Sequence, residues 1–224
     1  MRTFARENGL SLFFFGIFAA TIVGQSFAGQ HAYNAEQASH GEPTVSWGRY
    51  VLSSDFGGAV MENWQSEFLQ FTLFILATVW LLQKGSPESK QLGDAGVESK
   101  QKQRLEGYAP DGGPRWAKVT GWRSWIYQNS LLLAMSAIFL ATWVAQSLTN
   151  WTEFNDERAA HDEPALSWGE FVLNAEFWER TLQNWQSEFL AVGTMAVFAI
   201  YLRQRGSAES KPVGAPHDET GSSG

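Results

Sequence analysis

The 224-residue chain contains no cysteine, and this absence excludes several kinds of chemistry. Without thiols there is no disulfide framework, no thiolate metal site and no cysteine nucleophile. The sequence also lacks a phosphate-binding loop, a G-x-G-x-x-G turn, a G-x-S-x-G elbow and an H-E-x-x-H zinc motif. We therefore assign no catalytic residues, expect no cofactor, and consider an enzyme the less favoured class.

Charged residues are missing from four long apolar runs. These runs cover residues 10–27, 68–82, 131–148 and 189–202, and none contains Asp, Glu, Lys or Arg. A helix needs about 20 residues to cross a hydrocarbon core of about 30 Å. The second and fourth runs reach that length only if their helices begin at Asn63 and Asn184. The sequence therefore predicts four transmembrane helices, over residues 10–27, 63–82, 131–148 and 184–202.

The first apolar run also resembles a secretory signal peptide, because MRTFAR precedes it and SFAG follows it. A similar segment recurs in mid-chain at residues 131–148, where it cannot act as an N-terminal signal. The recurrence favours a retained transmembrane helix.

The chain is similar to itself at an offset of 121 residues. Residues 6–90 align with residues 127–211 over 85 positions without a gap, and 36 of those positions are identical. This similarity indicates a tandem duplication of a two-helix hairpin. Each half has an even number of spans, so both halves should face the same way as a parallel repeat. The expected fold class is an all-α membrane protein with four transmembrane helices in two tandem hairpins.

The repeat also defines the domain organisation. The first hairpin covers residues 1–90 with an outer loop at 28–62, and the second covers 127–211 with an outer loop at 149–183. Residues 91–126 form a linker rich in Gly, Pro and charge, which ends in an aromatic and basic segment typical of an interfacial helix. Residues 212–224 are predicted to be a disordered tail.

Basic residues are distributed unevenly between the two sides of the predicted spans. The termini and residues 84–125 hold 13 of the 16 Lys and Arg, whereas residues 28–67 and 149–188 hold 14 acidic residues against three basic ones. Because Lys and Arg mark cytoplasmic segments, we expect both termini and the linker in the cytoplasm. The acidic outer side argues against nucleic-acid binding. The expected partners are the lipid bilayer and a membrane or envelope protein.

The segment NWQSEFL occurs at residues 63–69 and again at 184–190. On a helix its Asn, Ser and Glu share one face, and polar groups avoid lipid, so this stripe should face the bundle interior. With one glutamine from each of the other two spans, the predicted intramembrane polar cluster comprises Gln25, Asn63, Ser66, Glu67, Gln146, Asn184, Ser187 and Glu188. Its two glutamates either cap the outer bundle end or share a proton or a cation.

Each outer loop carries the series E-x-x-x-H-x-E-P followed by S-W-G. Imidazole and carboxylate groups ligate Zn²⁺ and other divalent ions, so a metal site is one interpretation. Its ligands would be Glu36, His40, Glu42, Glu157, His161 and Glu163. A pH-sensitive His–Glu contact and a structural polar cluster are the alternatives. The segments TVSWGRYVL and ALSWGEFVL, which follow the prolines, predict short amphipathic helices in the outer loops.

The tandem H-x-E-P, S-W-G and N-W-Q-S-E-F motifs resemble those of bacterial membrane proteins of this length that are classed as a domain of unknown function. The resemblance covers residues 6–211 and implies a bacterial cytoplasmic membrane location, but it implies no activity. Three functional hypotheses follow. The first is a non-enzymatic membrane protein, the second is a proton- or cation-handling protein that uses the paired Glu and His residues, and the third is a metal-dependent membrane enzyme.

Overall fold

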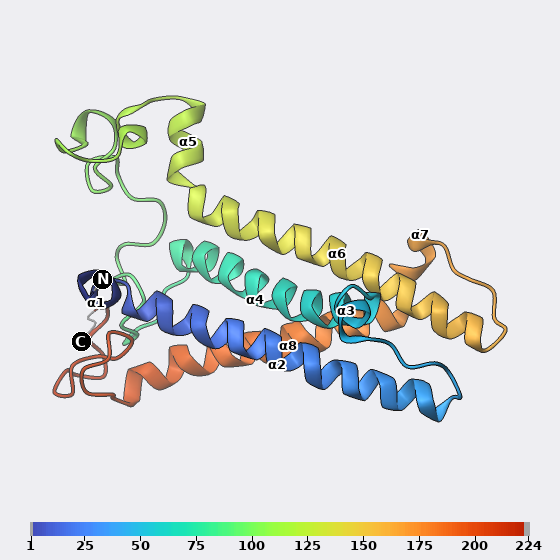
Figure 1. Cartoon of the computed structure of the whole chain (residues 1–224). Helices are drawn as coiled ribbons and strands as arrows, with labels where there is room; N and C mark the ends of the chain where they lie inside the picture. Colours follow the sequence, from blue (N-terminus) through green and yellow to red (C-terminus); the bar gives the residue numbers. More distant parts are fainter. Residues whose placement is uncertain (1, 222–224) are drawn as a thin grey trace. The chain divides into compact units, whose positions relative to one another are not determined.

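The structure is a computed structural model that describes residues 2–221. All regular elements in that range are helical (Figure 1). The four long helices are α2 (Gly9–Ser39), α4 (Ser54–Trp80), α6 (Ser130–Ala160) and α8 (Ala175–Tyr201). The short elements between them are α1 (Arg2–Glu7), α3 (Trp47–Val51), η1 (Glu106–Tyr108), η2 (Arg115–Lys118), α5 (Trp122–Gln128) and α7 (Trp168–Phe171). Short helices therefore occur where the segments after the two prolines predicted them.

The long helices extend well beyond the apolar runs that they contain. Helix α2 continues to Ser39 and α6 to Ala160, so both pass the predicted ends at residues 27 and 148. Helices α4 and α8 begin at Ser54 and Ala175, before the predicted starts at residues 63 and 184. Several of the added residues are Ala, Gln and Glu, which favour helix without being apolar enough for lipid. Most of each predicted outer loop is therefore helix.

Two of the four long helices, α2 and α6, contain 18-residue windows that are apolar enough to cross a membrane. The prediction of four such spans is not supported by this criterion. Helices α4 and α8 fall short because each carries the polar NWQSE segment and ends at Trp80 or Tyr201. Each keeps 13 residues after that segment, 68–80 and 189–201, which make about 20 Å of helix.

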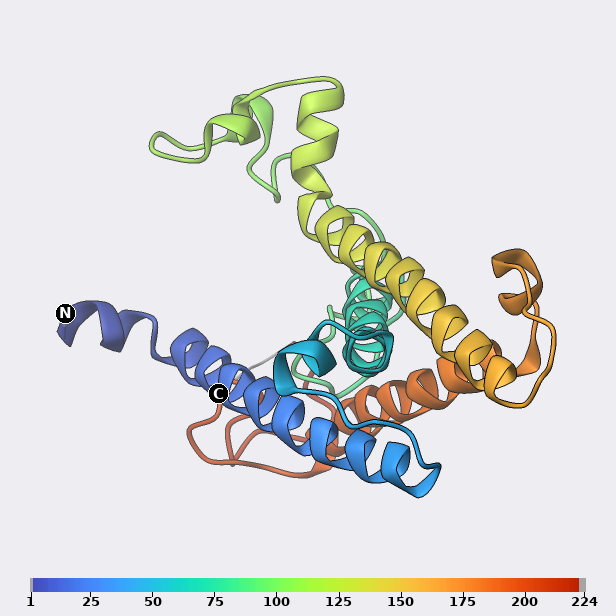
Figure 2. The ribbon, with the colours of Figure 1, turned by 45° about the vertical axis from the view of Figure 1, so that its right-hand side comes forward.

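The described chain divides into two compact units. Unit 1 consists of the residues through Met61 together with Gln146–Phe171, and unit 2 consists of Glu62–Ala145 together with the residues from Val172 onward. In unit 1, α3 folds back beside α2, as Figure 1 and Figure 2 show.

Aromatic pairs at equivalent positions hold the two short helices of unit 1. The buried ring of Tyr50 in α3 lies 5.6 Å from the ring of Tyr33 in α2. At the positions 121 residues later, the buried ring of Phe171 in α7 lies 5.3 Å from that of Phe154 in α6. Each short helix therefore packs through its fourth residue onto the long helix that precedes it, where burial of a large ring stabilises the contact.

The start of α4 approaches the outer part of α6 closely within unit 1. A Cβ atom on Gly58 would lie 2.8 Å from Oδ1 of Asn150, and one on Gly57 would lie 3.2 Å from Cγ2 of Thr149. Asn150 is almost fully buried, so its side chain has little room to move. Glycine at position 58 is therefore required by the distance between the two helices.

Unit 2 contains an aromatic cluster around Trp143 of α6. Its ring centroid lies 5.6 Å from that of Phe139 on the same helix and 6.3, 6.0 and 5.9 Å from those of Phe177, Trp178 and Trp185 on α8. Stacked and edge-on aromatic pairs at these separations add about 0.5–1.5 kcal/mol each beyond their buried area. The cluster joins α6 to α8 through contacts between aromatic rings.

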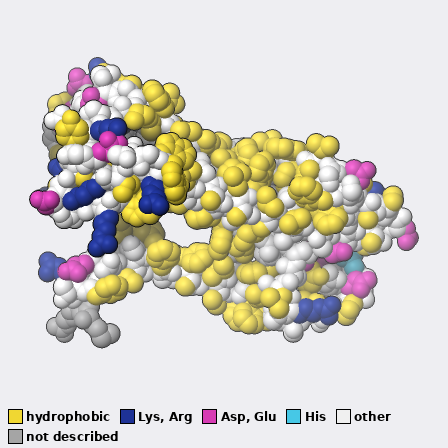
Figure 3. Space-filling model, turned by 90° about the horizontal axis from the view of Figure 1, so that it is seen from above, with side chains coloured by type: hydrophobic (Ala, Val, Ile, Leu, Met, Phe, Trp, Pro, Cys, Tyr) yellow, Lys and Arg dark blue, Asp and Glu magenta, His cyan; other side chains and the backbone are white. Residues whose placement is uncertain are grey.

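Many large apolar side chains remain on the surface. Hydrophobic side chains cover much of the face shown in Figure 3, with few charges among them over its middle part. In α2 the rings of Phe13, Phe14 and Phe15 are each at least 60% exposed. Apolar patches of this extent mark a surface that meets lipid or another protein.

The aromatic cluster predicts a difference between equivalent positions of the two halves. We expect Trp143→Ala to destabilise the protein by about 3 kcal/mol, because it removes the ring that contacts four others. The matched control is Ile22→Ala, at the equivalent position of α2, which should lower the free energy of unfolding clearly less. Thermal unfolding of the detergent-purified variants measures both. Equal losses would show that the Trp143 cluster is not a principal packing contact.

Candidate functional site

The retained asparagines of the outer loops bind backbone rather than a ligand. The Asn34 side chain donates to the carbonyl oxygen of Val45 at 2.9 Å and accepts from its N–H at 2.7 Å. Asn155 makes the same pair of bonds with Leu166, at 3.0 and 2.8 Å. Each asparagine thereby satisfies both backbone polar groups of one loop residue. We call this arrangement the asparagine clamp.

The tryptophan of each S-W-G segment binds the long helix that precedes the loop. The Trp47 indole N–H donates to the hydroxyl of Ser26 at 3.0 Å, and the Trp168 N–H donates to that of Ser147 at 3.1 Å. Both serines are buried and lie on the long helix before the loop. The serine and tryptophan identities between the two halves therefore have a structural cause.

The H-x-E-P series forms the C-terminal cap of α2 and of α6. The N–H of Glu42 bonds to the Gln37 carbonyl at 2.8 Å, and the N–H of Gly41, in the left-handed region, bonds to the Ala38 carbonyl at 3.2 Å. These two bonds define a Schellman motif, and proline commonly follows such a cap. Residues 158–163 repeat both bonds, with Asp162 at a φ of 56° in place of the glycine.

The six proposed metal ligands lie exposed in these caps, and other groups occupy two of them. Glu163 forms an ion pair with Arg158 at 2.8 Å, and Nδ1 of His161 lies 2.9 Å from the carbonyl oxygen of Glu157. Within residues 2–221, no three His, Asp or Glu side chains lie close enough together to hold a metal ion. The metal site formed by Glu36, His40, Glu42 and their equivalents stays a prediction, without a preformed ligand set.

The strongest buried polar arrangement lies in unit 2, between α4 and α8. Gln65 is fully buried, and its side-chain oxygen accepts from the Trp185 indole N–H at 2.7 Å. The Arg180 guanidinium lies 3.5 Å from the carboxylate of Glu62 and 3.0 Å from that of Glu176. We call Glu62, Gln65, Glu176, Arg180 and Trp185 the polar cluster.

The predicted intramembrane residues divide by burial rather than by repeat position. Ser66 and Gln146 are buried, and Asn184 and Glu188 are half-buried. Gln25, Asn63, Glu67 and Ser187 are exposed. The intramembrane polar cluster therefore stays a prediction.

Sequence reasoning missed most of the polar cluster. Gln65 belongs to a matched motif, but the pattern does not distinguish it from the other residues of that motif. Glu62 and Arg180 have no charged equivalents in the other half. The equivalent of Glu62 is Gln183, and that of Arg180 is Ala59. The available signal was Arg180, one of only three basic residues in the acidic outer segments. The cluster joins helices through one amide, one indole and one ion pair, and it presents no nucleophile beside a general base.

The inner ends of α4 and α8 carry a second matched arrangement, which we call the inner turns, residues 83–90 and 204–211. The hydroxyl of Ser89 accepts from the N–H of Gln83 at 2.9 Å, and that of Ser210 accepts from Gln204 at 2.9 Å. These bonds satisfy the backbone N–H groups of residues that lie just beyond the C-terminal end of each helix. The serine of each E-S-K sequence therefore has a structural role.

The inner turns also bring two equivalent carboxyl groups together. The side chains of Glu88 and Glu209 share a hydrogen bond. Partial burial, this bond and the negative charge of Glu209 together raise the pKa of Glu88 to about 7. One proton can therefore be held between the two turns near neutral pH.

The retained lysine of the second inner turn has a backbone role. Nζ of Lys211 is buried and donates to the carbonyl oxygens of Pro216, His217 and Glu219, each at 3.0 Å. These bonds gather residues 212–219 around one ammonium group. The disorder expected for residues 212–224 stays a prediction.

The fold and these contacts define an all-helical protein with two helices apolar enough to cross a membrane. The chain belongs to the family described as a domain of unknown function, DUF6766, whose model matches residues 1–222. No curated protein and no solved structure matches the chain. The expectation of a family without an assigned activity is confirmed.

The asparagine clamps predict a local loss of stability. Asn155→Ala removes two hydrogen bonds, so we expect the segment 161–167 to open more readily, by about 1–3 kcal/mol. Limited proteolysis should show faster cleavage there, and Asn34→Ala should act likewise on residues 40–46. His40→Ala, in the same loop but exposed, is the control. Equal cleavage of all three variants would contradict the clamp.

The Glu88 carboxyl predicts a pH dependence of the inner turns. When unfolded the group ionises near its ordinary pKa of 4.5, whereas when folded it keeps its proton until about 7. Stability of the turns should therefore fall as pH rises between these values and stay constant above them. The loss is on the order of 1 kcal/mol, because the carboxyl remains exposed to screening solvent.

Hydrogen exchange of residues 83–91 and 204–211, measured across this range and corrected for intrinsic rates, tests the pair. Glu88→Gln should remove the pH dependence, while Asp111→Asn, a linker carboxyl 3.9 Å from Lys118, should leave it intact. A dependence that persists in Glu88→Gln would exclude the shared proton.

Proposed function

We propose that the protein is a non-enzymatic multi-pass protein of the bacterial cytoplasmic membrane, built of four spans and acting through contacts with lipid or with another membrane protein. In this arrangement α2, α4, α6 and α8 all cross, both termini and the linker are cytoplasmic, and the two hairpins form a parallel repeat. The proposal goes beyond the two helices that meet the criterion for a span.

The observation that carries the proposal is the exposure of α6. Only 17% of its 18-residue apolar window is buried. The apolar core helix of a soluble protein buries most of its surface, and a signal sequence lies near the N-terminus, whereas α6 begins at residue 130. A mid-chain helix that leaves such a surface uncovered is suited to lipid.

The four-span arrangement is supported by the equivalence of the two hairpins. The asparagine clamps, the tryptophan–serine bonds and the inner turns recur at positions 121 residues apart. Because the two hairpins have equivalent local structure, we expect α4 to cross the membrane as α2 does, and α8 to cross it as α6 does. It also supports a tandem duplication as the origin of the chain.

A non-enzymatic role is supported by what the retained polar residues contact. The matched Asn, Ser and Trp side chains bind backbone groups or one another, and the H-x-E-P residues build helix caps. The polar cluster of unit 2 joins α4 to α8. These contacts account for the matched Asn, Ser and Trp residues of the loops without a substrate.

Single-cysteine labelling gives a direct test, because the chain has no cysteine and hence no background. The variants Thr44→Cys, Ala95→Cys and Ala165→Cys place one exposed thiol in the first outer loop, the linker and the second outer loop. With a membrane-impermeant maleimide on intact cells, we expect positions 44 and 165 to react and position 95 to be protected until the membrane is permeabilised.

The alternative topology gives the opposite pattern at two positions. If α2 and α6 alone crossed, residues 44 and 95 would lie on one side and residue 165 on the other. Labelling of position 95 with protection of position 165 would therefore overturn the four-span proposal, while its two-span form would survive. Recovery of the protein in the soluble fraction, with all three thiols protected in intact cells, would overturn membrane insertion altogether.

A further inference from the structure

An open cavity of about 1080 Å³ lies in unit 2, where the linker meets the end of α4 and helix α5. Its lining includes Val79 from α4, Lys90, Lys100 and Arg104 from the linker, and Trp125 from α5. Ligand sites commonly occupy about 300–1,000 Å³ and combine apolar walls with a few polar groups, which describes this lining.

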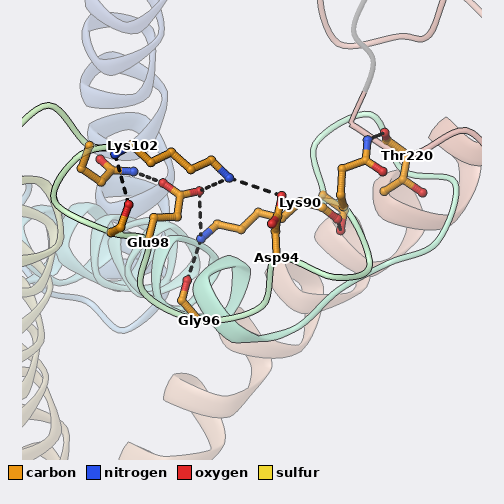
Figure 4. A network of polar contacts seen from close by, with 10 residues as sticks. Lys90, Asp94, Gly96, Glu98, Lys102 and Thr220 are labelled. Carbon is orange, nitrogen blue, oxygen red and sulfur yellow. Dashed lines mark hydrogen bonds and ion pairs between the residues drawn. The ribbon is translucent and has the colours of Figure 1, made fainter.

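The linker wall of the cavity is fixed by a network of polar contacts (Figure 4). The N–H of Gly96 donates to the carbonyl of Val79 at 2.7 Å, and Nζ of Lys90 donates to the carbonyl of Gly96 at 2.9 Å. Glu98 lies 3.6 Å from the ammonium groups of both Lys90 and Lys102. The linker is therefore attached to the last turn of α4 by one backbone hydrogen bond, and ion pairs join the two ends of its loop.

The charges on the lining do not balance. Its cations are Lys90, Lys100 and Arg104, and its one anion, Glu98, is already matched by two lysines. Lys100 pairs with Glu106 at 2.7 Å. Arg104 is exposed and has no ion pair among residues 2–221. The cavity thus offers an uncompensated guanidinium, the group best suited to bind a phosphate through two parallel hydrogen bonds.

The surroundings of the cavity are those of a membrane interface. Trp116, Trp122 and Trp125 are each about half exposed or more, at 48, 67 and 59%. The Arg123 guanidinium lies 5.4 Å from the ring centre of Trp122. Exposed tryptophans interleaved with basic residues on a short helix are typical of a segment at the level of lipid headgroups.

We propose that this cavity binds the phosphate headgroup of an anionic membrane lipid, with Arg104 as its principal ligand. Val79 and Trp125 offer apolar contacts to the glycerol and the first methylenes of the acyl chains. The inference rests on the proposed cytoplasmic position of the linker at the membrane surface. A lipid fits better than a free phosphate, because the apolar walls would give a free phosphate nothing to contact.

The test compares lipid retention by the full-length protein in nanodiscs made of phosphatidylcholine mixed with phosphatidylglycerol. Native mass spectrometry counts each lipid kept by the released protein. We expect the wild type to retain phosphatidylglycerol preferentially, and Arg104→Gln to lower the ratio of the two lipids about tenfold, as loss of a charge-assisted hydrogen bond implies. Arg104→Lys should restore part of the preference.

The matched control is Arg115→Gln, which removes the same charge from the same linker but lies outside the cavity lining. Equal ratios in the wild type and Arg104→Gln, or an equal fall in Arg115→Gln, would overturn the site in favour of general charge attraction. Displacement of the retained lipid by excess inorganic phosphate would assign the cavity to free phosphate instead. Circular dichroism establishes that each variant is folded.

Failure of the lipid site and failure of the proposed topology give different results. A protein that shows the four-span labelling pattern but no lipid preference contradicts the headgroup site alone. A protein whose position 95 reacts in intact cells contradicts the cytoplasmic linker, whatever lipid it retains.

Discussion

Backbone hydrogen-bonding groups that are released where a helix ends must find new partners, and the rest of this structure depends on how they do so. At the outer ends of α2 and α6 a Schellman cap and an asparagine clamp receive them. At the inner ends of α4 and α8 a serine hydroxyl does so. Many of the residues that the two halves share lie at these helix ends, because a cap needs a particular side chain, whereas lipid contact needs only an apolar one.

The polar cluster breaks the equivalence of the halves. Its ion pair joins Glu62 to Arg180, and the residues at the equivalent positions, Gln183 and Ala59, cannot form one. Gln65 is fully buried while Gln186 is exposed, although both belong to the same seven-residue motif. The first half supplies Glu62 and Gln65 to this contact and the second half supplies Arg180 and Trp185, so the two halves contribute different residues to it.

Much of the helical framework could be predicted from the sequence, because apolar runs without charge and prolines after H-x-E mark helices and their ends. The helix extensions through Ser39 and Ala160 were missed because their residues favour helix without being apolar. The site was less predictable. Gln65 of one copy of NWQSEFL is buried against Trp185 of the other copy, and the identical sequences of the two copies do not show which glutamine is buried.

The 13-residue apolar parts of α4 and α8 have a consequence for the membrane itself. Their length of about 20 Å is well below the usual hydrocarbon thickness of about 30 Å, while α2 and α6 carry full-length apolar windows. In the proposed four-span arrangement, lipids beside the short segments would compress or tilt to avoid exposing their chains, and those beside the long ones would not. A four-span protein of this kind would surround itself with a bilayer of uneven thickness and would be favoured wherever the membrane is already thin.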